Sequence, residues 1–353
     1  MTFVIFGLSV SSSWGNGHAT IWRGLIRALA GMGHRITFFE KDVRYYASNR
    51  DLTVIEGMEL ILYENWRQVE TTVRIRLKNA DVAIVTSYCP DAASATEMLE
   101  NITGLLKIFY DLDTPVTLQS IENNSWPPYI PDKGLAMYDC ILSFTGGIVL
   151  GKLKSVLGAC SVFPLYGCAD SETHFPSDKL PIYNGDLSYM GTFAADRQKK
   201  LVELFIEPAK KVPRKRFILG GVMYPNDFPW SENICYYEHI APPEHPSFYC
   251  SSKFTLNITR EAMAKNGFCP SGRLFEAAIC GVAVISDWWD GLDDFFIPGE
   301  EILIAEKSQH VVEIIEMSDE KRLKIATQAR KRCLSEHTAK HRAEELVKIV
   351  SQF

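Results

Sequence analysis

The sequence predicts an α/β protein with two doubly wound domains, and three observations lead to this prediction. Short β-branched or aromatic runs alternate with amphipathic stretches over the first hundred residues, which is typical of βαβ units around a parallel sheet. The same alternation starts again after residue 184. The length of 353 residues exceeds what one core of ordinary size requires. We expect domains over residues 1–182 and 183–335, and a C-terminal helix over 336–353 that can cross back to the first domain.

The composition excludes several classes of protein. With 46% hydrophobic residues and no low-complexity tract, the chain should fold throughout. The net charge of −6 argues against a duplex nucleic-acid binder, which normally carries a basic footprint. Nine scattered cysteines without a C-x-x-C pair indicate reduced thiols and no zinc ribbon. Because no basic leader and no apolar stretch of about 20 residues occurs, we expect a cytoplasmic protein without a membrane span.

In the first half, the hydrophobic pattern predicts four strands and one amphipathic helix. The helix covers residues 17–32, where Ile21, Trp22, Leu25, Ile26 and Leu29 share one face. The strands cover residues 2–6, 35–39, 82–86 and 105–110. Ligands of open α/β sheets bind beyond the carboxyl ends of the strands, so the following loops should form the site.

In the second half, the α/β pattern resumes after a polar, proline-containing segment at residues 174–184, which we interpret as the linker. The expected strands cover residues 187–190, 217–219, 254–257 and 282–286. The expected helices cover residues 196–211, 272–280 and 319–350.

The loop after the first strand is rich in small residues that permit close approach to a ligand. It contains Ser13, Trp14, Gly15, Asn16 and Gly17 and leads to His18. Free amides at a helix start can bind anions or sugar hydroxyls, whereas the glycine spacing does not match a dinucleotide motif. His18 could act as a general base near neutral pH, or it could cap the helix or contact substrate.

Two carboxylates, Asp111 and Asp113, follow the strand that ends at residue 110. Alternate residues of a strand point to the same side, so both side chains should emerge near the same sheet edge. Either could orient His18 and stabilise its cation. The alternatives are a D-x-D metal site for a nucleotide diphosphate and simple capping of the turn.

The segment from Cys269 to Gly281 has the features of a diphosphate site. Ser271 and Gly272 begin a helix that Gly281 ends, and Arg273 lies in its first turn. The helix dipole favours an anion, and a guanidinium binds phosphate oxygens. Glu276, one turn later, could instead form a surface ion pair with Arg273.

These residues also carry a resemblance to a known family. The runs at 273–281, 284–287, 291–292 and 295–303 resemble the C-terminal domain of CgeB-like (spore-maturation-type) glycosyltransferases. Residues 14–18 and 33–34 give weaker support. Those enzymes belong to the glycosyltransferase group 1 superfamily and have the two-domain GT-B fold. The resemblance implies a nucleotide-sugar donor such as a UDP-sugar. We expect neither a metal nor another cofactor, because the guanidinium of Arg273 and the helix amides can stabilise the departing diphosphate.

The resemblance assigns roles to individual residues. Glu276 is similar in position to the glutamate that holds the donor ribose, while Arg273, Ser271 and Gly272 would hold the diphosphate. His18 lies where many inverting GT-B enzymes keep their base. Cys269 occupies the place of a glutamate that related retaining enzymes carry seven residues before the ribose glutamate. Further donor-side residues are Gly191, Thr192, Gly220, Gly221 and Arg260, and further acceptor or sugar contacts are Trp288 and Asp290.

The sequence therefore predicts a metal-independent glycosyltransferase with an unidentified acceptor, which could be a small molecule, a glycan or a protein. Three alternatives remain open. One is a nucleotide-sugar epimerase or phosphorylase of the same fold. Another is an inactive protein that only binds a nucleotide sugar, which Cys269 would explain. The last is a metal-dependent transferase that uses Asp111 and Asp113.

Overall fold

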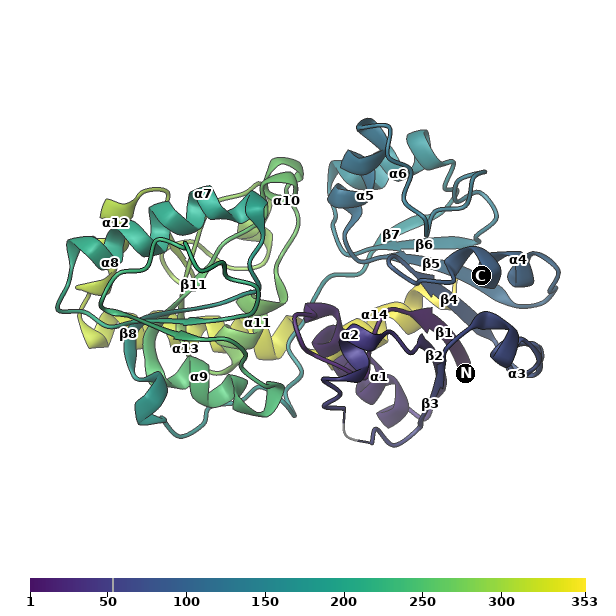
Figure 1. The fold of residues 1–353 in the computed structure, drawn as a ribbon, viewed down its shortest axis with the longest axis horizontal. Helices are drawn as coiled ribbons and strands as arrows, with labels where there is room; N and C mark the ends of the chain where they lie inside the picture. The colour runs from purple at the N-terminus through teal and green to yellow at the C-terminus, as the bar shows by residue number, and fades with distance from the viewer. Residues whose placement is uncertain (53) are drawn as a thin grey trace. The chain divides into compact units, whose positions relative to one another are not determined.

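The computed structural model describes residues 1–52 and 54–353, which form two compact units. The first unit comprises residues 1–166 together with 339–353, and the second comprises residues 167–338 (Figure 1). The segment 167–182, which the sequence analysis grouped with the first domain, makes its contacts within the second unit. No described helix has both the length and the apolar surface needed to cross a bilayer.

The first unit is built on a seven-stranded sheet in the order β3-β2-β1-β4-β5-β6-β7, in which every neighbouring pair is parallel. Its inner strands are buried on both faces, which explains their nearly continuous apolar sequences. The strands are β1 (Thr2–Gly7), β2 (Arg35–Lys41), β3 (Met58–Tyr63), β4 (Val82–Thr86), β5 (Leu106–Asp111), β6 (Cys140–Ser143) and β7 (Val162–Pro164).

Helices connect these strands. Helix α1 buries Trp22, Leu25, Ile26 and Leu29, as the predicted amphipathic pattern requires. Its N-terminus is fixed by Asn16, whose side chain accepts a hydrogen bond from the backbone of His18. The helices of this unit are α1 (Gly17–Gly31), α2 (Arg44–Ala47), α3 (Trp66–Lys78), α4 (Ala92–Glu100), α5 (Thr114–Glu122), α6 (Ile148–Leu157) and α14 (Ala339–Val350).

The second unit repeats the architecture on a six-stranded parallel sheet in the order β10-β9-β8-β11-β12-β13. The strands are β8 (Gly185–Met190), β9 (Phe217–Gly220), β10 (Ile234–Tyr237), β11 (Ser252–Asn257), β12 (Ala283–Ser286) and β13 (Leu303–Ile304). The helices are α7 (Gln198–Leu201), α8 (Glu207–Lys211), α9 (His245–Ser251), α10 (Glu261–Asn266), α11 (Gly272–Ile279), α12 (Ser308–Ile315) and α13 (Asp319–Glu336). The two-sheet α/β fold class predicted from the sequence is confirmed.

The helix predicted over residues 196–211 is continuous but irregular. It begins with a 3₁₀ turn at Ala195–Arg197, passes through α7 and widens into a π-helical turn at Val202–Ile206 before α8. Pro208 lies one residue into α8 and has no N–H to donate to the preceding turn. The wider turn accommodates this missing hydrogen bond.

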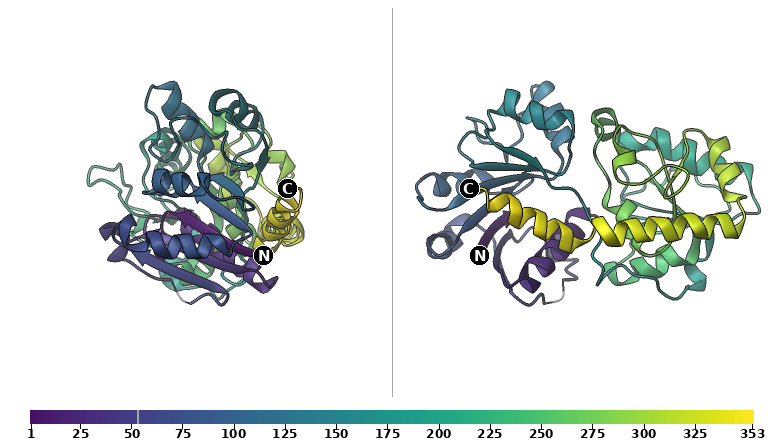
Figure 2. Two further views of the ribbon diagram at one scale, coloured as in Figure 1. Left: turned by 90° about the vertical axis from the view of Figure 1, so that its right-hand side faces the viewer. Right: turned by 180° about the vertical axis from the view of Figure 1, so that it is seen from behind.

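The stretch predicted to be helical over residues 319–350 contains two helices, and the second lies within the C-terminal segment expected to be helical over residues 336–353. Helix α13 ends at Glu336 and α14 begins at Ala339 (Figure 2). Between them, the carbonyl of His337 accepts a hydrogen bond from the Ala169 backbone at 2.9 Å, and Thr338 forms an isolated β-bridge with Ala169. These extended contacts interrupt the helix. Helix α14 then packs against α1 in the first unit.

Each sheet has one place where the chain changes the direction in which it adds strands. In the first unit this switch lies between β1 and β4, and in the second unit it lies between β8 and β11. The loops that leave the carboxyl ends of two adjacent strands diverge there, which is where open α/β sheets bind ligands. The loops after β1, β4, β8 and β11 are therefore where a ligand-binding site is expected.

Candidate functional site

The first group of candidate residues lies beyond β1 and β5 of the first unit. His18 is the second residue of α1, and Asp113 immediately precedes α5. The Nε2 atom of His18 lies 3.6 Å from Oδ2 of Asp113, and both side chains are largely buried. This distance is longer than a hydrogen bond but short enough for an ion pair when the imidazole is protonated. The predicted pairing of His18 with a carboxylate is therefore geometrically possible with Asp113.

Asp111 has a different environment, although it lies only two residues earlier. It is the last residue of β5 and is completely buried. Its Oδ1 atom accepts hydrogen bonds from Oγ1 of Thr117 at 3.1 Å and from the Asp113 backbone at 3.2 Å. Burial raises the pKa of Asp111 to about 6. These contacts hold the turn into α5, which Asp113 immediately precedes.

The loop after β1 is held in place by carboxylates. Glu40, at the end of β2, is buried and accepts hydrogen bonds from the backbones of Val10 and Ser11 at 2.7 and 2.9 Å. Asp51 accepts from the Ser13 backbone at 3.0 Å and pairs with Arg23 at 2.6 Å. These three amides already have anionic partners within the protein. The free amides expected for an anion are those at the start of the following helix, not those of the loop itself.

The second group of candidate residues lies beyond β8 and β11 of the second unit and is centred on Arg273. Its Nη1 atom donates to Oδ1 of Asn257, the last residue of β11, at 2.9 Å. Its Nε atom donates to the carbonyl oxygen of Met190, the last residue of β8. The guanidinium also lies 5.0 Å from the centre of the Tyr189 ring. Arg273 therefore bridges the two strands at the switch point.

Glycines make room for this arrangement. A Cβ atom on Gly191 would lie 2.9 Å from Nη2 of Arg273, which is closer than such contacts normally occur. Gly221 has a positive φ of 152°, and a Cβ there would lie 2.1 Å from the carbonyl oxygen of Gly191. Gly220 accepts a hydrogen bond from the Gly191 backbone at 2.8 Å. Gly191 thus lies beside Arg273, and Gly221 approaches Gly191 closely because neither glycine carries a side chain.

Glu276 lies one helical turn after Arg273 and is buried. Its Oε2 atom accepts a hydrogen bond from the hydroxyl of Tyr249 at 3.1 Å. Burial, followed by the nearby Glu276 charge, raises the pKa of Tyr249 well above its usual value, so Tyr249 remains a donor. Because Arg273 bonds Met190 and Asn257 while Glu276 bonds Tyr249, the surface ion pair considered in the sequence analysis does not account for these residues.

The remaining predicted residues of this unit lie around the same strand ends. Arg260 precedes α10 and pairs with Asp196 at 2.8 Å, while Ser271 is the residue before α11. The carbonyl oxygen of Thr192 accepts from Nη2 of Arg197 at 2.9 Å. Trp288 and Asp290 follow β12 and are exposed. The described structure thus places all predicted donor-side residues in the second unit, and it leaves their roles as predictions.

Two buried histidines beside Glu276 were not foreseen as a pair. Nε2 of His174 lies 3.2 Å from Nδ1 of His245, whose Nε2 lies 3.2 Å from the carbonyl oxygen of Ile240. Burial lowers the pKa of each histidine to about 4, so both are neutral at physiological pH. No sequence signal links them, because 71 residues separate them.

These histidines and Glu276 also form the one cluster, within the described part of the chain, whose geometry could hold a metal ion. One ligand atom from each lies within 4.8 Å of the others. The hydrogen bond between the two rings, with His245 donating to Ile240, already satisfies the nitrogens that face each other. Asp111 and Asp113, the metal ligands of the D-x-D alternative, belong to no such cluster among the described residues.

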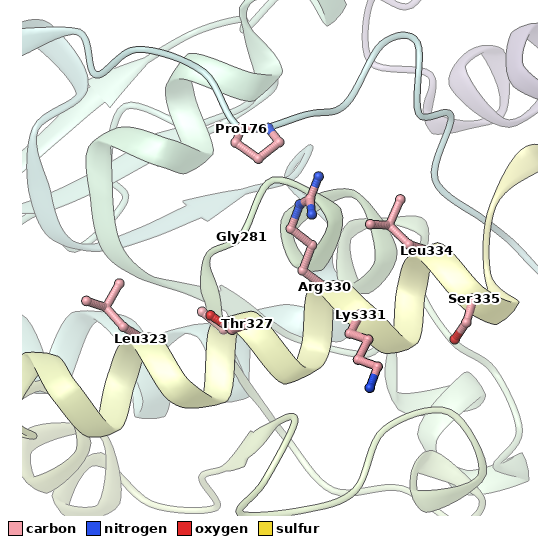
Figure 3. A pocket seen from close by; sticks show the side chains of 9 residues that line it. Pro176, Gly281, Leu323, Thr327, Arg330, Lys331, Leu334 and Ser335 are labelled. Atoms are coloured by element: carbon pink, nitrogen blue, oxygen red, sulfur yellow. The ribbon is translucent and has the colours of Figure 1, made fainter.

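A separate hollow of about 700 Å³ lies along α13 in the second unit. Its charged lining residues are Arg330 and Lys331, while Pro176 and Gly281 border it (Figure 3). Arg330 donates from Nε to the carbonyl oxygen of Ile279 at 3.0 Å. None of the predicted site residues lines this hollow.

Comparison with known proteins identifies the fold. Residues 197–348 match a family model described as glycosyl transferase-like. The whole chain superposes on sucrose-phosphate synthase from Thermosynechococcus elongatus with a TM-score of 0.71 at 12% identity, covering 100% of this chain and 98% of that chain. This protein has the GT-B fold. At the level of sequence, the search of curated proteins found no significant match.

Two further GT-B structures are similar over their full length. Anabaena HepE in complex with UDP and glucose has a TM-score of 0.70 at 11% identity, covering 100% of both chains. An α-glucosyltransferase in complex with UDP and DNA has a TM-score of 0.71 at 11% identity, covering 99% of both chains. At such low identity these similarities establish the GT-B architecture alone.

The raised pKa of Asp111 predicts a dependence of stability on pH. A carboxyl group with a raised native pKa stabilises the fold at low pH, and this contribution is lost as the pH rises through about 6. Relative to Asp111→Asn, the wild-type protein should gain about 1 kcal/mol of unfolding free energy when the pH falls from 8 to 5. Urea unfolding of both proteins at the two pH values measures this gain. Parallel pH dependences would show that Asp111 is ionised in the native state at pH 5.

Proposed function

We propose that this protein is a CgeB-like GT-B glycosyltransferase that transfers a sugar from a nucleoside-diphosphate sugar to an acceptor hydroxyl. The observation that carries this proposal is the position of Arg273 and Glu276 in the first turns of α11, beside the switch point between β8 and β11. An arginine and a helix N-terminus together suit a diphosphate. A buried carboxylate one turn later suits a pair of ribose hydroxyls.

The proposed donor site assigns a separate task to each group. Arg273 is held by Met190 and Asn257, so its guanidinium enters the reaction already oriented. With the backbone amides at Ser271 and Gly272, it would stabilise the negative charge of the leaving diphosphate. Glu276 would accept hydrogen bonds from the two ribose hydroxyls while Tyr249 fixes its carboxylate. Fixed positive charge would thus serve where other transferases use a metal ion, and no cofactor is required.

We further propose that the donor is a UDP-sugar. HepE was solved with UDP and glucose and with UDP-glucose, and the α-glucosyltransferase was solved with UDP. Their similar architecture supports the same class of donor here. One of these neighbours was also solved with DNA. For this chain the net charge of −6 favours an acceptor other than nucleic acid.

His18 is the proposed general base, and Asp113 is its proposed partner. In the reaction, the acceptor hydroxyl would transfer its proton to His18 while the hydroxyl oxygen forms a bond to the anomeric carbon of the donor sugar. The bond between that carbon and the diphosphate oxygen would break at the same time. Asp113, 3.6 Å from Nε2, would stabilise the resulting imidazolium. This step inverts the anomeric carbon, which agrees with Cys269 in the place of the glutamate of retaining relatives.

Binding of nucleoside diphosphates tests the donor site. UDP and UDP-glucose should raise the melting temperature, because a ligand that binds only the native state stabilises it. Arg273→Ala and Glu276→Gln should each weaken binding by about tenfold to a hundredfold, since each removes a charged hydrogen-bonding group. Lys331→Ala removes an exposed charge from the same unit and should leave binding unchanged.

Calorimetric titration of UDP into the four proteins gives the affinities. If neither UDP, GDP nor ADP shifts the melting temperature of the wild-type protein, the transferase proposal fails. If the nucleotide sugar binds but UDP is never released from it, with or without candidate acceptors, the chain is an inactive nucleotide-sugar binder. Formation of an isomeric nucleotide sugar would indicate an epimerase, and a requirement for inorganic phosphate would indicate a phosphorylase.

Turnover tests the base. His18→Ala should lower the rate of UDP release from the bound donor by about 10²- to 10⁴-fold, as expected for loss of a general base. Its affinity for UDP should not change, because the proposed donor groups belong to the second unit. A near-normal rate would remove His18 from the mechanism.

A further inference from the structure

A strained tyrosine lies beside the His18–Asp113 pair. Tyr88 is the second residue after β4 and has a φ of +62°, a left-handed conformation that bulky side chains rarely adopt. The preceding residue, Ser87, donates its backbone N–H to the Tyr110 carbonyl oxygen at 3.0 Å, and the following residue, Cys89, donates to that of Thr86 at 3.3 Å. The chain thus makes a tight turn directly at the end of the strand. Such strain persists only where the surrounding structure fixes it, and it often marks functional sites.

The turn directs the Tyr88 ring toward His18. The two ring centres lie 5.8 Å apart with an interplanar angle of 34°. On its other side, Tyr88 lies 5.1 Å from the Tyr129 ring. The position is also determined by topology, because β1 and β4 are the neighbours at the switch point and the loops after them carry His18 and Tyr88.

Hydrogen-bond donors and acceptors around Tyr88 determine what its hydroxyl does. Thr117 donates its single hydroxyl proton to Asp111 at 3.1 Å, so the Tyr129 hydroxyl, 3.0 Å away, donates to Thr117. The Tyr88 hydroxyl is hydrogen-bonded to the Asp113 carboxylate and donates to it, because an ionised carboxylate only accepts hydrogen bonds. Burial, with the charge of Asp113 next in importance, raises the pKa of Tyr88 well above its usual value, so its proton stays in place.

We propose that Tyr88 is a positioning residue that holds both members of the His18–Asp113 pair, the imidazole through its ring and the carboxylate through its hydroxyl. This inference rests on the proposed function for its catalytic consequence, but the positioning itself can be measured without turnover. The hydrogen bond from Tyr88 weakens the electrostatic attraction between the Asp113 carboxylate and the His18 imidazolium. Tyr88 therefore limits how strongly Asp113 stabilises the protonated form of His18, so that His18 can release its proton after the reaction.

The test is the titration of His18 by NMR in the full-length protein labelled at histidine, with its signal assigned by its loss in His18→Gln. Among the described residues, the titratable groups that interact with Asp113 include Asp111, Tyr88 and Tyr129. Tyr88→Phe keeps the ring and removes only the hydroxyl. It should raise the midpoint of the His18 titration by about half a pH unit, because the full Asp113 charge then stabilises the imidazolium. Asp113→Asn should lower the midpoint, which gives the opposite sign.

Tyr138→Phe is the matched control. Tyr138 is another buried tyrosine of the same unit, and its hydroxyl bonds Thr96 at 2.7 Å. This variant loses a buried hydrogen bond elsewhere in the unit and should leave the His18 midpoint unchanged. An unchanged midpoint in Tyr88→Phe, or an equal shift in Tyr138→Phe, would overturn the proposal.

Turnover then separates this proposal from the proposed function. Tyr88→Phe should lower kcat for UDP release by about tenfold, with an unchanged KM for the donor, and should move the acidic limb of the pH profile in the same direction as the His18 midpoint. A shifted midpoint in a protein that binds no nucleotide sugar would contradict the transferase and leave the positioning role intact. An unchanged midpoint in an active transferase would contradict the positioning role alone.

Discussion

The parallel pairing of every strand within each sheet determines where the chemically important groups of this protein gather. Parallel strands end at the same edge, and the loops that leave that edge diverge where the strand order changes direction. In the first unit this change lies between β1 and β4, and in the second unit it lies between β8 and β11. His18 and Tyr88 follow the first two strands, and Arg273 joins the ends of the last two.

The two groups of residues are held by different means. In the second unit the contacts are steric as well as polar, because glycines at 191 and 221 leave room for backbone and guanidinium to approach closely. In the first unit buried carboxylates secure the loops: Glu40 holds the backbone after β1, and Asp111 holds the turn after β5. Contacts within the protein thus fix these groups, and such preorganisation is what electrostatic catalysis requires.

The sequence predicted most of what hydrophobic periodicity can report. The strands β1, β4 and β11 and the helices α1 and α11 lie within one or two residues of their predicted positions, since buried strands and amphipathic helices have distinct periods. A separate C-terminal helix was expected from residue 336, but the extended conformation of residues 337–338 was not, because their bonding partner, Ala169, is remote in sequence. The strands β3, β6, β7, β10 and β13 were not predicted, and three of them, β7, β10 and β13, are at most four residues long with partly exposed side chains.

The candidate site was predicted in outline and not in detail. The spacing of Asp111 and Asp113 suggested that both side chains share one side of a strand, but the strand ends at Asp111 and Asp113 precedes a helix. Only the structure therefore distinguishes the carboxylate near His18 from the buried one. Tyr88 carries no sequence signal, because a left-handed tyrosine is fixed by its neighbours and not by its own preference. The same holds for His174 and His245, which meet across 71 residues.

Hydrogen exchange with and without UDP tests most directly the central claim, that a nucleotide binds at the switch point of the second unit. We expect slower exchange in peptides covering residues 189–192, 219–224 and 257–276, where the strand ends and the start of α11 lie. We expect no change in peptides covering residues 327–335, which line the separate hollow along α13. Protection confined to residues 327–335, or an absence of protection throughout the second unit at saturating UDP, would contradict this claim.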